Sequence, residues 1–190
     1  MKKMKMGPQP MLWPHPTVLV GADVDGKPDF AAVAWTGVAA STPPAVSIAL
    51  QHPRYSLKGI RQNQSFSINI PSREMVKETD YCGLISGART DKVADCKFKV
   101  FYGKTPNAPM LEQCPINLEC EVRHLLNMGS HILVIGEVKE THVTESCLTE
   151  GHPDINKVKP FSFVPPHYYA VGEAFADAFS IGREIKDIKG

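Results

Sequence analysis

The sequence predicts an all-β-dominated fold with short helices, arranged as an antiparallel barrel. Sixteen prolines and fourteen glycines divide the 190 residues into short apolar runs, a pattern typical of strands and turns. Residues 65–70 and 116–123 alternate between polar and apolar side chains, as half-buried strands do. Because closure of a sheet removes its exposed edges, several such strands at short spacing favour a closed antiparallel barrel.

The expected elements follow one another with short connections. The expected strands cover residues 17–22, 30–38, 45–50, 65–70, 116–123 and 131–138. Asp25-Gly26 predicts a tight hairpin between the first two strands, and Asn127-Met128-Gly129 predicts a turn between the last two. Ser56 is a suitable N-cap for a helix to about residue 62, and Ser72 for a helix to about residue 85.

Charge and composition restrict the possible partners. The formal net charge is +1, so the whole molecule has no electrostatic reason to bind nucleic acid or an anionic membrane, and any attraction for an anion must be local. The basic start of the chain is not followed by an apolar run of signal-peptide length, and no run is long enough to span a bilayer. We therefore expect a cytoplasmic protein that binds neither nucleic acid nor membrane.

The cysteines indicate a reducing compartment. Their number is odd, five, and no two are spaced as C-x-x-C, which argues against a disulfide framework and against a zinc ribbon. Free thiols that are mostly buried are the simplest interpretation. No metal site is expected.

The first candidate site is Trp35-Thr36-Gly37-Val38, at the end of an expected strand. A planar aromatic ligand needs a flat apolar wall with backbone groups at its polar edge, and a glycine permits close backbone approach. The alternative is a strand end with a core tryptophan, because tryptophan is usually found in cores or interfaces.

The second candidate site is Arg54-Tyr55-Ser56-Leu57, at the start of the expected helix. The guanidinium, the Ser56 hydroxyl and the positive end of a helix dipole are groups that bind phosphate. An ordinary capped helix with a surface arginine is the alternative.

Two weaker candidates follow. Ser86-Gly87, with Lys92 five residues on, offers a hydroxyl, a free amide and an ammonium, although most such loops are merely solvated. His131 begins a strand, where it can contact a ligand or serve a structural role.

Several well-known motifs do not occur in the sequence. There is no P-loop and no G-x-G-x-x-G, so a Rossmann phosphate turn is excluded. H-E-x-x-H and G-x-S-x-G do not occur either.

In their order along the chain, several segments resemble the flavin reductase-like family, and within it the flavoredoxin branch. The segments with this resemblance are Pro14-His15-Pro16-Thr17-Val18-Leu19-Val20, Asp25-Gly26-Lys27-Pro28-Asp29, Ala34-Trp35-Thr36-Gly37-Val38, Pro43-Pro44-Ala45-Val46-Ser47-Ile48, Arg54-Tyr55-Ser56, Phe66-Ser67-Ile68-Asn69-Ile70-Pro71, Ser86-Gly87, Asp91-Lys92, Pro115-Ile116-Asn117-Leu118-Glu119-Cys120, Gly129-Ser130-His131 and Ile135-Gly136-Glu137-Val138. They span about residues 14–172, the core of a single domain expected over 1–190. The ordered set is more specific than any one segment.

The resemblance implies an FMN-binding split barrel of antiparallel Greek-key type, usually a homodimer with the flavin near the subunit interface. It implies that Trp35, Thr36, Gly37 and Val38 line the isoalloxazine ring. It also implies that Arg54, Ser56, Leu57, Ser86, Gly87 and Lys92 surround the phosphate or ribityl chain, with His131 near the ring. The C-terminal tail, with Tyr168, Tyr169 and Phe175 to Phe179, is expected to pack on the barrel or on a partner subunit.

Asp29 departs from the family pattern, which often has asparagine there. A carboxylate facing inward would repel a phosphate, so we expect Asp29 to turn away from the site, or the contact to differ in this chain.

Three functions fit the resemblance. In the first, NADH or NADPH reduces bound FMN, which passes electrons to a free flavin or another acceptor, with no side chain needed as acid or base. In the second, the chain is an electron carrier reduced by a redox protein partner. In the third, it is a binding module for another flat ligand or for none.

Overall fold

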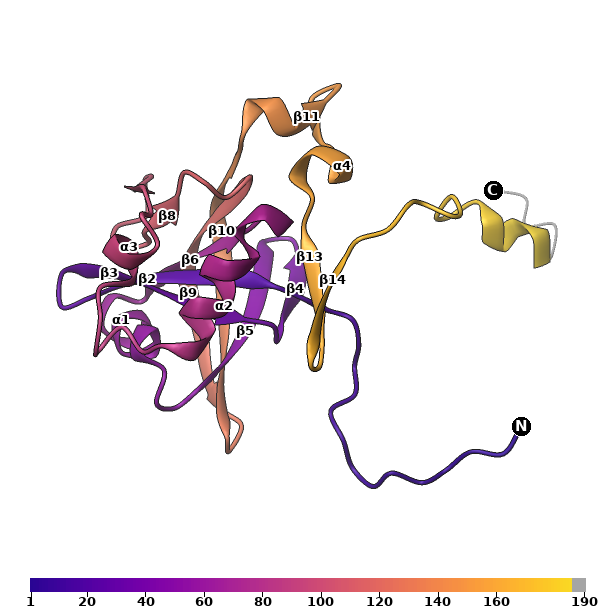
Figure 1. Cartoon of the computed structure of the whole chain (residues 1–190), viewed down its shortest axis with the longest axis horizontal. Helices are drawn as coiled ribbons and strands as arrows, with labels where there is room; N and C mark the ends of the chain where they lie inside the picture. Colours follow the sequence, from indigo (N-terminus) through magenta and orange to yellow (C-terminus); the bar gives the residue numbers. More distant parts are fainter. Residues whose placement is uncertain (186–190) are drawn as a thin grey trace.

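The computed structural model describes residues 1–185, and its central element is a seven-stranded antiparallel sheet (Figure 1). The strand order is β3-β2-β6-β9-β10-β5-β4. These strands are β2 (Val18–Val24), β3 (Lys27–Val33), β4 (Thr36–Ser41), β5 (Pro44–Gln51), β6 (Ser65–Ile70), β9 (Ile116–Asn127) and β10 (His131–Val143). The strands curl around a shared core, and the edge strands β3 and β4 do not pair with each other in the described chain. The barrel is therefore split rather than closed, as the resemblance implied.

The inner face of the sheet carries the main core. Val20, Ile48, Phe66 and Val134 come from four different strands and are completely buried there. These positions follow the period of two that a strand imposes. The expectation that 65–70 is half-buried was wrong, because the polar side chains on its other face are covered too: Ser67 and Asn69 are completely buried.

Strand β2 has no solvent-exposed face, because both of its sides are covered by other parts of the chain. All residues of β2 are buried. Val18, Val20 and Ala22 face the main core, whereas Leu19 packs with Phe30 in a second core. This second core explains why residues 18–22 carry no polar side chain, instead of alternating between polar and apolar ones.

Three short helices cover the sheet and frame the site. They are α1 (Tyr55–Asn63), α2 (Val76–Leu84) and α3 (Lys92–Asp95). Helix α1 packs on β2, where a Cβ at Gly59 would clash with the Asp23 carbonyl group, so only glycine permits this close approach. Helices α2 and α3 pack against β3 and cover the edge that it would otherwise expose.

A three-stranded sheet lies beside the barrel. It consists of β1 (His15–Pro16), β13 (Phe161–Val164) and β14 (His167–Ala170), in the order β1-β13-β14. The remaining elements are η1 (Arg73–Met75), β7 (Val100–Phe101), β8 (Met110–Leu111), η2 (Glu145–Cys147), β11 (Leu148–Thr149), β12 (His152–Pro153), α4 (Ile155–Val158) and η3 (Ile181–Ile185). Strand β1, near the start of the chain, thus pairs with β13, which lies near its end.

Three further local predictions were wrong. The strand expected over 30–38 is interrupted at Ala34 and Trp35, because the chain leaves β3 at one edge of the split barrel and enters β4 at the other. The N-cap of α1 is Arg54, so Ser56 lies within the helix and its hydroxyl does not cap it. Ser72 precedes the short 3₁₀ helix η1 rather than the α-helix, and its side chain makes no capping hydrogen bond.

The cysteines agree with the sequence expectation. All five are free, and four of them are buried. Burial raises the pKa of Cys82 to about 12, so this thiol stays protonated at neutral pH.

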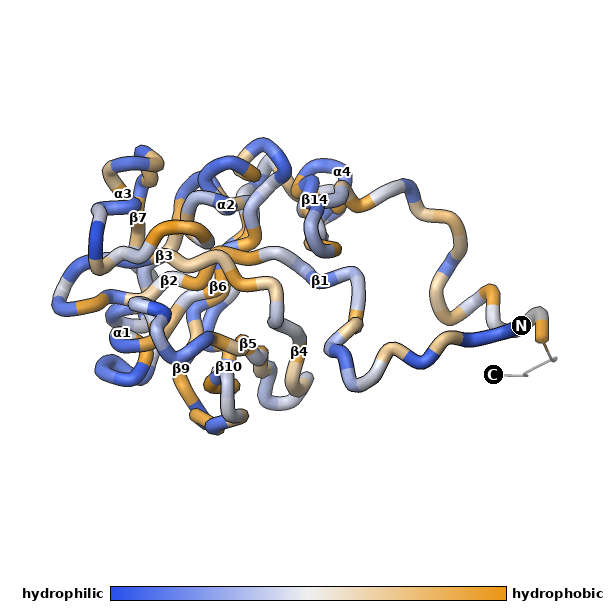
Figure 2. The backbone as a smooth tube through the Cα atoms, turned by 60° about the horizontal axis from the view of Figure 1, so that its bottom comes forward, coloured by the Kyte–Doolittle hydropathy of each residue, from blue (hydrophilic) through white to orange (hydrophobic). Residues whose placement is uncertain are grey.

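Both termini leave the barrel on the same side. Residues 1–14 and 171–185 extend away from the body beyond β4, β13 and β14 (Figure 1). Figure 2 shows apolar stretches within both segments, and the Phe175 and Phe179 side chains are each 98% exposed. The tail therefore packs on the barrel as far as Ala170, and residues 171–185 make no such contact. Among residues 1–185, no helix is long and apolar enough to cross a membrane.

Candidate functional site

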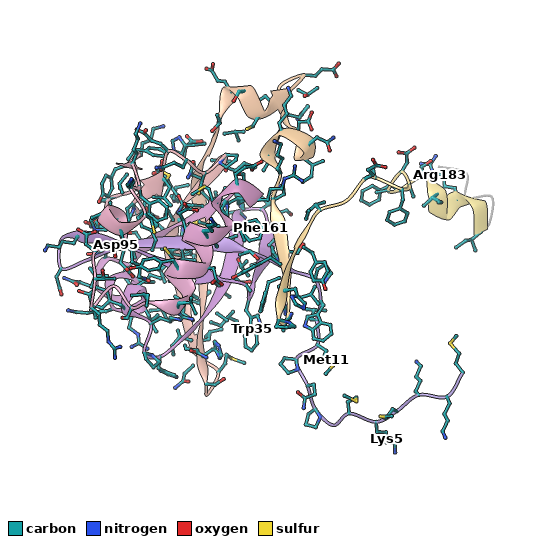
Figure 3. The ribbon with its side chains drawn as sticks, in the orientation of Figure 1. Lys5, Met11, Trp35, Asp95, Phe161 and Arg183 are labelled. Carbon is teal, nitrogen blue, oxygen red and sulfur yellow. The ribbon has the colours of Figure 1, made fainter. Side chains whose placement is uncertain are left out.

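An apolar cavity of about 360 Å³ opens where the break between β3 and β4 meets the second sheet. It is lined by Thr17, Ala32, Val33, Ala34, Trp35, Ala49, Leu50, Gln51, Arg54, Gly83, His131, Phe163 and Tyr168. Figure 3 shows Trp35 beside the β13–β14 hairpin, between the barrel and the N-terminal segment. The cavity exists because side chains on β3 and β5 are small, such as Ala32 and Ala49, and aromatic side chains line its sides.

Trp35 and His131 form one wall of the apolar cavity. Their ring centroids lie 4.6 Å apart with an angle of 30° between the ring planes, so the rings are nearly stacked. The Trp35 carbonyl accepts a hydrogen bond from the Ala49 amide at 2.8 Å, which ties the interrupted strand to β5. His131 is opposite Gln51 in the β10–β5 ladder, which places it at the same edge of the sheet.

Tyr168 contributes a polar group to the apolar cavity. Its hydroxyl donates a hydrogen bond to the Asp80 carboxylate at 2.7 Å. Burial and this contact raise the pKa of Tyr168 to about 12, so the phenol remains neutral at physiological pH.

A polar pocket of about 200 Å³ lies next to the apolar cavity. It is lined by Ala31, Gln51, Pro53, Arg54, Tyr55, Ser56, Leu84, Ile85, Ser86 and Lys92. Gln51 and Arg54 line both spaces, so the two are contiguous. Nη1 of Arg54 donates to the Gly83 carbonyl at 2.8 Å, which fixes the guanidinium at the junction. A guanidinium has five N–H donors, so others are free for a ligand.

A network of buried polar groups forms the floor of the polar pocket. Nζ of Lys92 lies 3.0 Å from Oδ1 of Asp29 and donates to the Phe30 carbonyl at 2.6 Å. The Ser56 hydroxyl donates to Oδ2 of Asp29 at 2.7 Å. A Cβ at Gly87 would clash with the Asp29 carboxylate, so a glycine is needed for the 86–87 turn to lie here.

Asp29 does not turn away from the site, so the first of the two expectations for it was wrong. The carboxylate faces inward, behind the polar pocket, and the positive charge of Lys92 and the Ser56 hydroxyl satisfy it. Whether the phosphate contact differs from the family pattern stays a prediction.

The structure brings together some of the predicted site residues. Trp35, His131, Arg54, Ser56, Ser86 and Lys92 line one or both spaces. Four other predicted site residues do not line them. Thr36 donates to the Ser47 carbonyl, Gly37 and Val38 are exposed on the edge strand β4, and Leu57 is buried in the main core. A fifth, Gly87, lines neither space either, but it lies beside Asp29 and Tyr55, and Tyr55 lines the polar pocket.

Other lining residues were missed by sequence reasoning. Gln51, Gly83, Phe163 and Tyr168 belong to four different elements or loops and carry no common motif. Only the aromatic character of the tail pointed toward the last two. In the part of the chain that the structure describes, no group of three or more His, Cys, Asp or Glu side chains is arranged to hold a metal ion.

The chain belongs to the family of the flavin reductase like domain, whose model matches residues 11–171. A curated relative from Archaeoglobus fulgidus, an uncharacterized protein, is 30% identical over 146 residues, which cover 76% of this chain and 81% of the relative.

The fold is similar to that of two flavoredoxins. The structure of flavoredoxin from Methanosarcina acetivorans matches with a TM-score of 0.94 and 36% identity, covering 98% of this chain and all of that one. Flavoredoxin of Desulfovibrio vulgaris matches with a TM-score of 0.89 and 38% identity, covering 95% of this chain and all of that one.

Proposed function

We propose that this chain binds FMN across the apolar cavity and the polar pocket and acts as a flavin-dependent redox protein. The observation that carries the proposal is the contiguity of an aromatic-walled cavity with a pocket that contains a guanidinium and an ammonium. FMN joins a flat tricyclic ring to one phosphate, so its two ends need these two environments. Membership in the flavin reductase like family supports the same ligand.

The residues present fit FMN by charge and by shape. Trp35 and His131 offer a flat wall for the ring. Arg54 and Lys92 offer charge-assisted donors for the phosphate, each worth roughly 1.5–3 kcal/mol. The start of α1 and the Ser86 loop border the same pocket, and the positive end of a helix favours an anion.

The protein contributes binding, orientation and shielding to the reaction. Bound FMN supplies the hydride and electron transfer itself. Trp35 and His131 would hold the ring from one side, and Phe163 and Tyr168, which line the same cavity, would shield it from water. Arg54 lines both spaces, where it would hold the phosphate end of FMN beside the cavity for the ring.

The visible absorption spectrum of the purified protein tests the cofactor. We expect a flavin spectrum, and FMN as the chromophore released by denaturation. A colourless protein that takes up neither FMN nor riboflavin would favour the third function, a module for another flat ligand or for none.

For the electron donor, we infer a reduced nicotinamide, NADH or NADPH, with transfer through FMN to an acceptor. The alternative is an electron carrier reduced by a protein partner, and the similarity to two flavoredoxins is the observation that favours it. Anaerobic addition of NADH or NADPH distinguishes the two: bleaching of the flavin absorbance supports the nicotinamide. No bleaching with either donor, but reduction by a reduced redox protein such as ferredoxin, supports the carrier.

A homodimer is the expected assembly. Exposed apolar side chains on both terminal segments and on the edge strand β4 support it: Leu12 and Val38 are largely exposed, as are Phe175 and Phe179. Unpaired apolar strand edges and exposed apolar patches are typical of surfaces that another chain covers. Sedimentation of the protein at micromolar concentration should give the mass of two chains, and Phe175→Ser with Phe179→Ser should weaken the dimer.

A further inference from the structure

A buried carboxylate lies directly behind the polar pocket. Asp29, on β3, is 4% exposed, yet it contacts two groups that line the pocket, Ser56 and Lys92. Buried carboxylates are rare unless paired, so its partners here have to satisfy its charge.

Asp29 uses hydrogen-bond donors that a phosphate would otherwise receive. A serine hydroxyl has one hydrogen, and Ser56 donates it to Asp29. The Lys92 ammonium has three hydrogens; one points to Asp29 and another to the Phe30 carbonyl, which leaves one for a ligand.

Asp29 also reduces the local charge. Its negative charge offsets the positive charge of Lys92, so the Arg54 guanidinium provides the net positive charge among these three groups. A phosphate monoester carries nearly two negative charges at neutral pH. Since the network is buried, repulsion between Asp29 and the phosphate is only weakly screened by solvent.

We propose that Asp29 is a positioning residue that weakens the hold of the polar pocket on the flavin phosphate, so that FMN exchanges with free flavin. This inference rests on the proposed function, because it assumes that FMN is the ligand. It assigns Asp29 a role in selectivity: the carboxylate sets how strongly the site prefers FMN over riboflavin, which has the same ring system but no phosphate.

A purely structural role for Asp29 predicts the opposite result. If the carboxylate only keeps Lys92 charged and in place, its removal leaves a buried ammonium without its counterion, and that loss is costly. FMN binding would then weaken together with the stability of the fold.

The test is the substitution Asp29→Asn, with the dissociation constants of FMN and riboflavin measured by fluorescence titration of the flavin-free protein. An amide of the same shape removes the charge, and it can donate to Ser56 Oγ, which frees the hydroxyl hydrogen for the phosphate. We expect FMN to bind at least tenfold more tightly and to dissociate more slowly. Riboflavin affinity should change less than twofold.

Ser56→Ala provides a second, independent measurement. In the natural chain, the Ser56 hydrogen is committed to Asp29, so this substitution should change FMN affinity by less than threefold. In the Asp29→Asn background, it should remove a large part of the gain. Equal effects of Ser56→Ala in both backgrounds would contradict the inference.

Asp25→Asn is the matched control. Asp25 pairs with Lys58 at the surface, where Nζ and Oδ2 are 2.5 Å apart, and the substitution changes the net charge by the same amount. We expect it to leave FMN affinity unchanged. An equal gain in Asp25→Asn, or no gain or a loss of FMN affinity in Asp29→Asn, would overturn the role assigned to Asp29. If the natural chain binds neither flavin, the proposed function itself fails.

Discussion

The apolar cavity and the polar pocket share the Arg54 side chain but differ in how their walls are built. The cavity is formed by strand ends and aromatic rings from widely separated parts of the chain, including Trp35 and Tyr168. The pocket is formed by charged groups already engaged with one another, such as Lys92 with Asp29. If both spaces bind FMN as proposed, shape should decide what binds in the cavity, and competition for hydrogen-bond donors should decide it in the pocket.

If FMN binds as proposed, substitutions in the two regions should therefore change the affinities for FMN and riboflavin in different ways. A change in the apolar cavity alters contacts with the ring, which FMN and riboflavin share. A change in the polar pocket alters contacts with the phosphate, which only FMN carries. The ratio of FMN affinity to riboflavin affinity should therefore change for substitutions in the polar pocket and stay constant for substitutions in the apolar cavity.

The largest effect is expected from Arg54→Ala. It should weaken FMN binding by at least tenfold and leave riboflavin affinity nearly unchanged, because the lost charge-assisted hydrogen bonds are made to the phosphate. Flavin fluorescence titration measures both constants. Equal losses for the two ligands would show that Arg54 acts through its contact with Gly83, by holding α2 in place.

Trp35→Ala should have a smaller effect that does not discriminate between the ligands. Removing the indole leaves His131 without its stacking partner and opens the cavity wall, so both flavins should bind about fivefold more weakly. Ile155→Ala, on α4 and outside both spaces, is the control and should change neither constant. A loss for FMN alone would place Trp35 with the phosphate rather than with the ring.

Added salt should produce a still smaller effect. Raising the ionic strength from about 0.05 M to 0.5 M should weaken FMN binding by about threefold, because salt screens the attraction of Arg54 and Lys92 for the phosphate. Riboflavin is uncharged, and its affinity should not fall. Equal salt dependence for both ligands would argue against an ionic contribution from the polar pocket.

Glu119→Gln should leave both flavin affinities unchanged, because Glu119 lies outside the two spaces. This completely buried carboxylate accepts from the Thr105 amide at 2.5 Å and contacts Nε2 of His142 at 2.6 Å, linking β9, β10 and the 102–109 loop. We expect a loss of about 2 kcal/mol in the free energy of unfolding at pH 7. Chemical denaturation measures it, and Glu121→Gln, two residues along and only half-buried, is the control.

The loss in the free energy of unfolding caused by Glu119→Gln should depend on pH. Burial raises the pKa of Glu119, but hydrogen bonds from His142 and from Thr105 lower it more, so its pKa in the folded protein lies below the usual value. Its ionised form therefore stabilises the fold above the unfolded pKa, about 4.3, and this contribution is lost as the pH falls through the lower folded value. The difference between Glu119→Gln and the natural chain should shrink as the pH falls below about 4. A difference that persists unchanged at pH 3 would show that the charge is not responsible.

Local sequence patterns predicted most of the barrel. The alternation in 65–70 and 116–123, and the turn at 127–129, correspond to β6, β9 and the β9–β10 connection. The helix around Ser56 also exists, although the residue that begins it is Arg54. These elements were predictable because their signals depend on near neighbours in the chain.

The candidate site was only partly predictable. Motif resemblance identified Arg54, Ser86 and Lys92, which line the polar pocket. It did not identify Gly83 or Phe163, and it did not indicate that Asp29 would face inward. The contact of Asp29 on β3 with Lys92 on α3, more than sixty positions away, leaves no periodic signal in a single sequence.

The sequence by itself determined the strand-rich class of this protein, the order of its elements and the residue types available for binding an anion. Only the tertiary structure decided that the chain breaks at Trp35, that β13–β14 closes the cavity beside it, and that Asp29 takes donors from Ser56 and Lys92. The physical reason is range: hydrophobic periodicity and turn chemistry act between neighbours, whereas a pocket is made where distant segments converge.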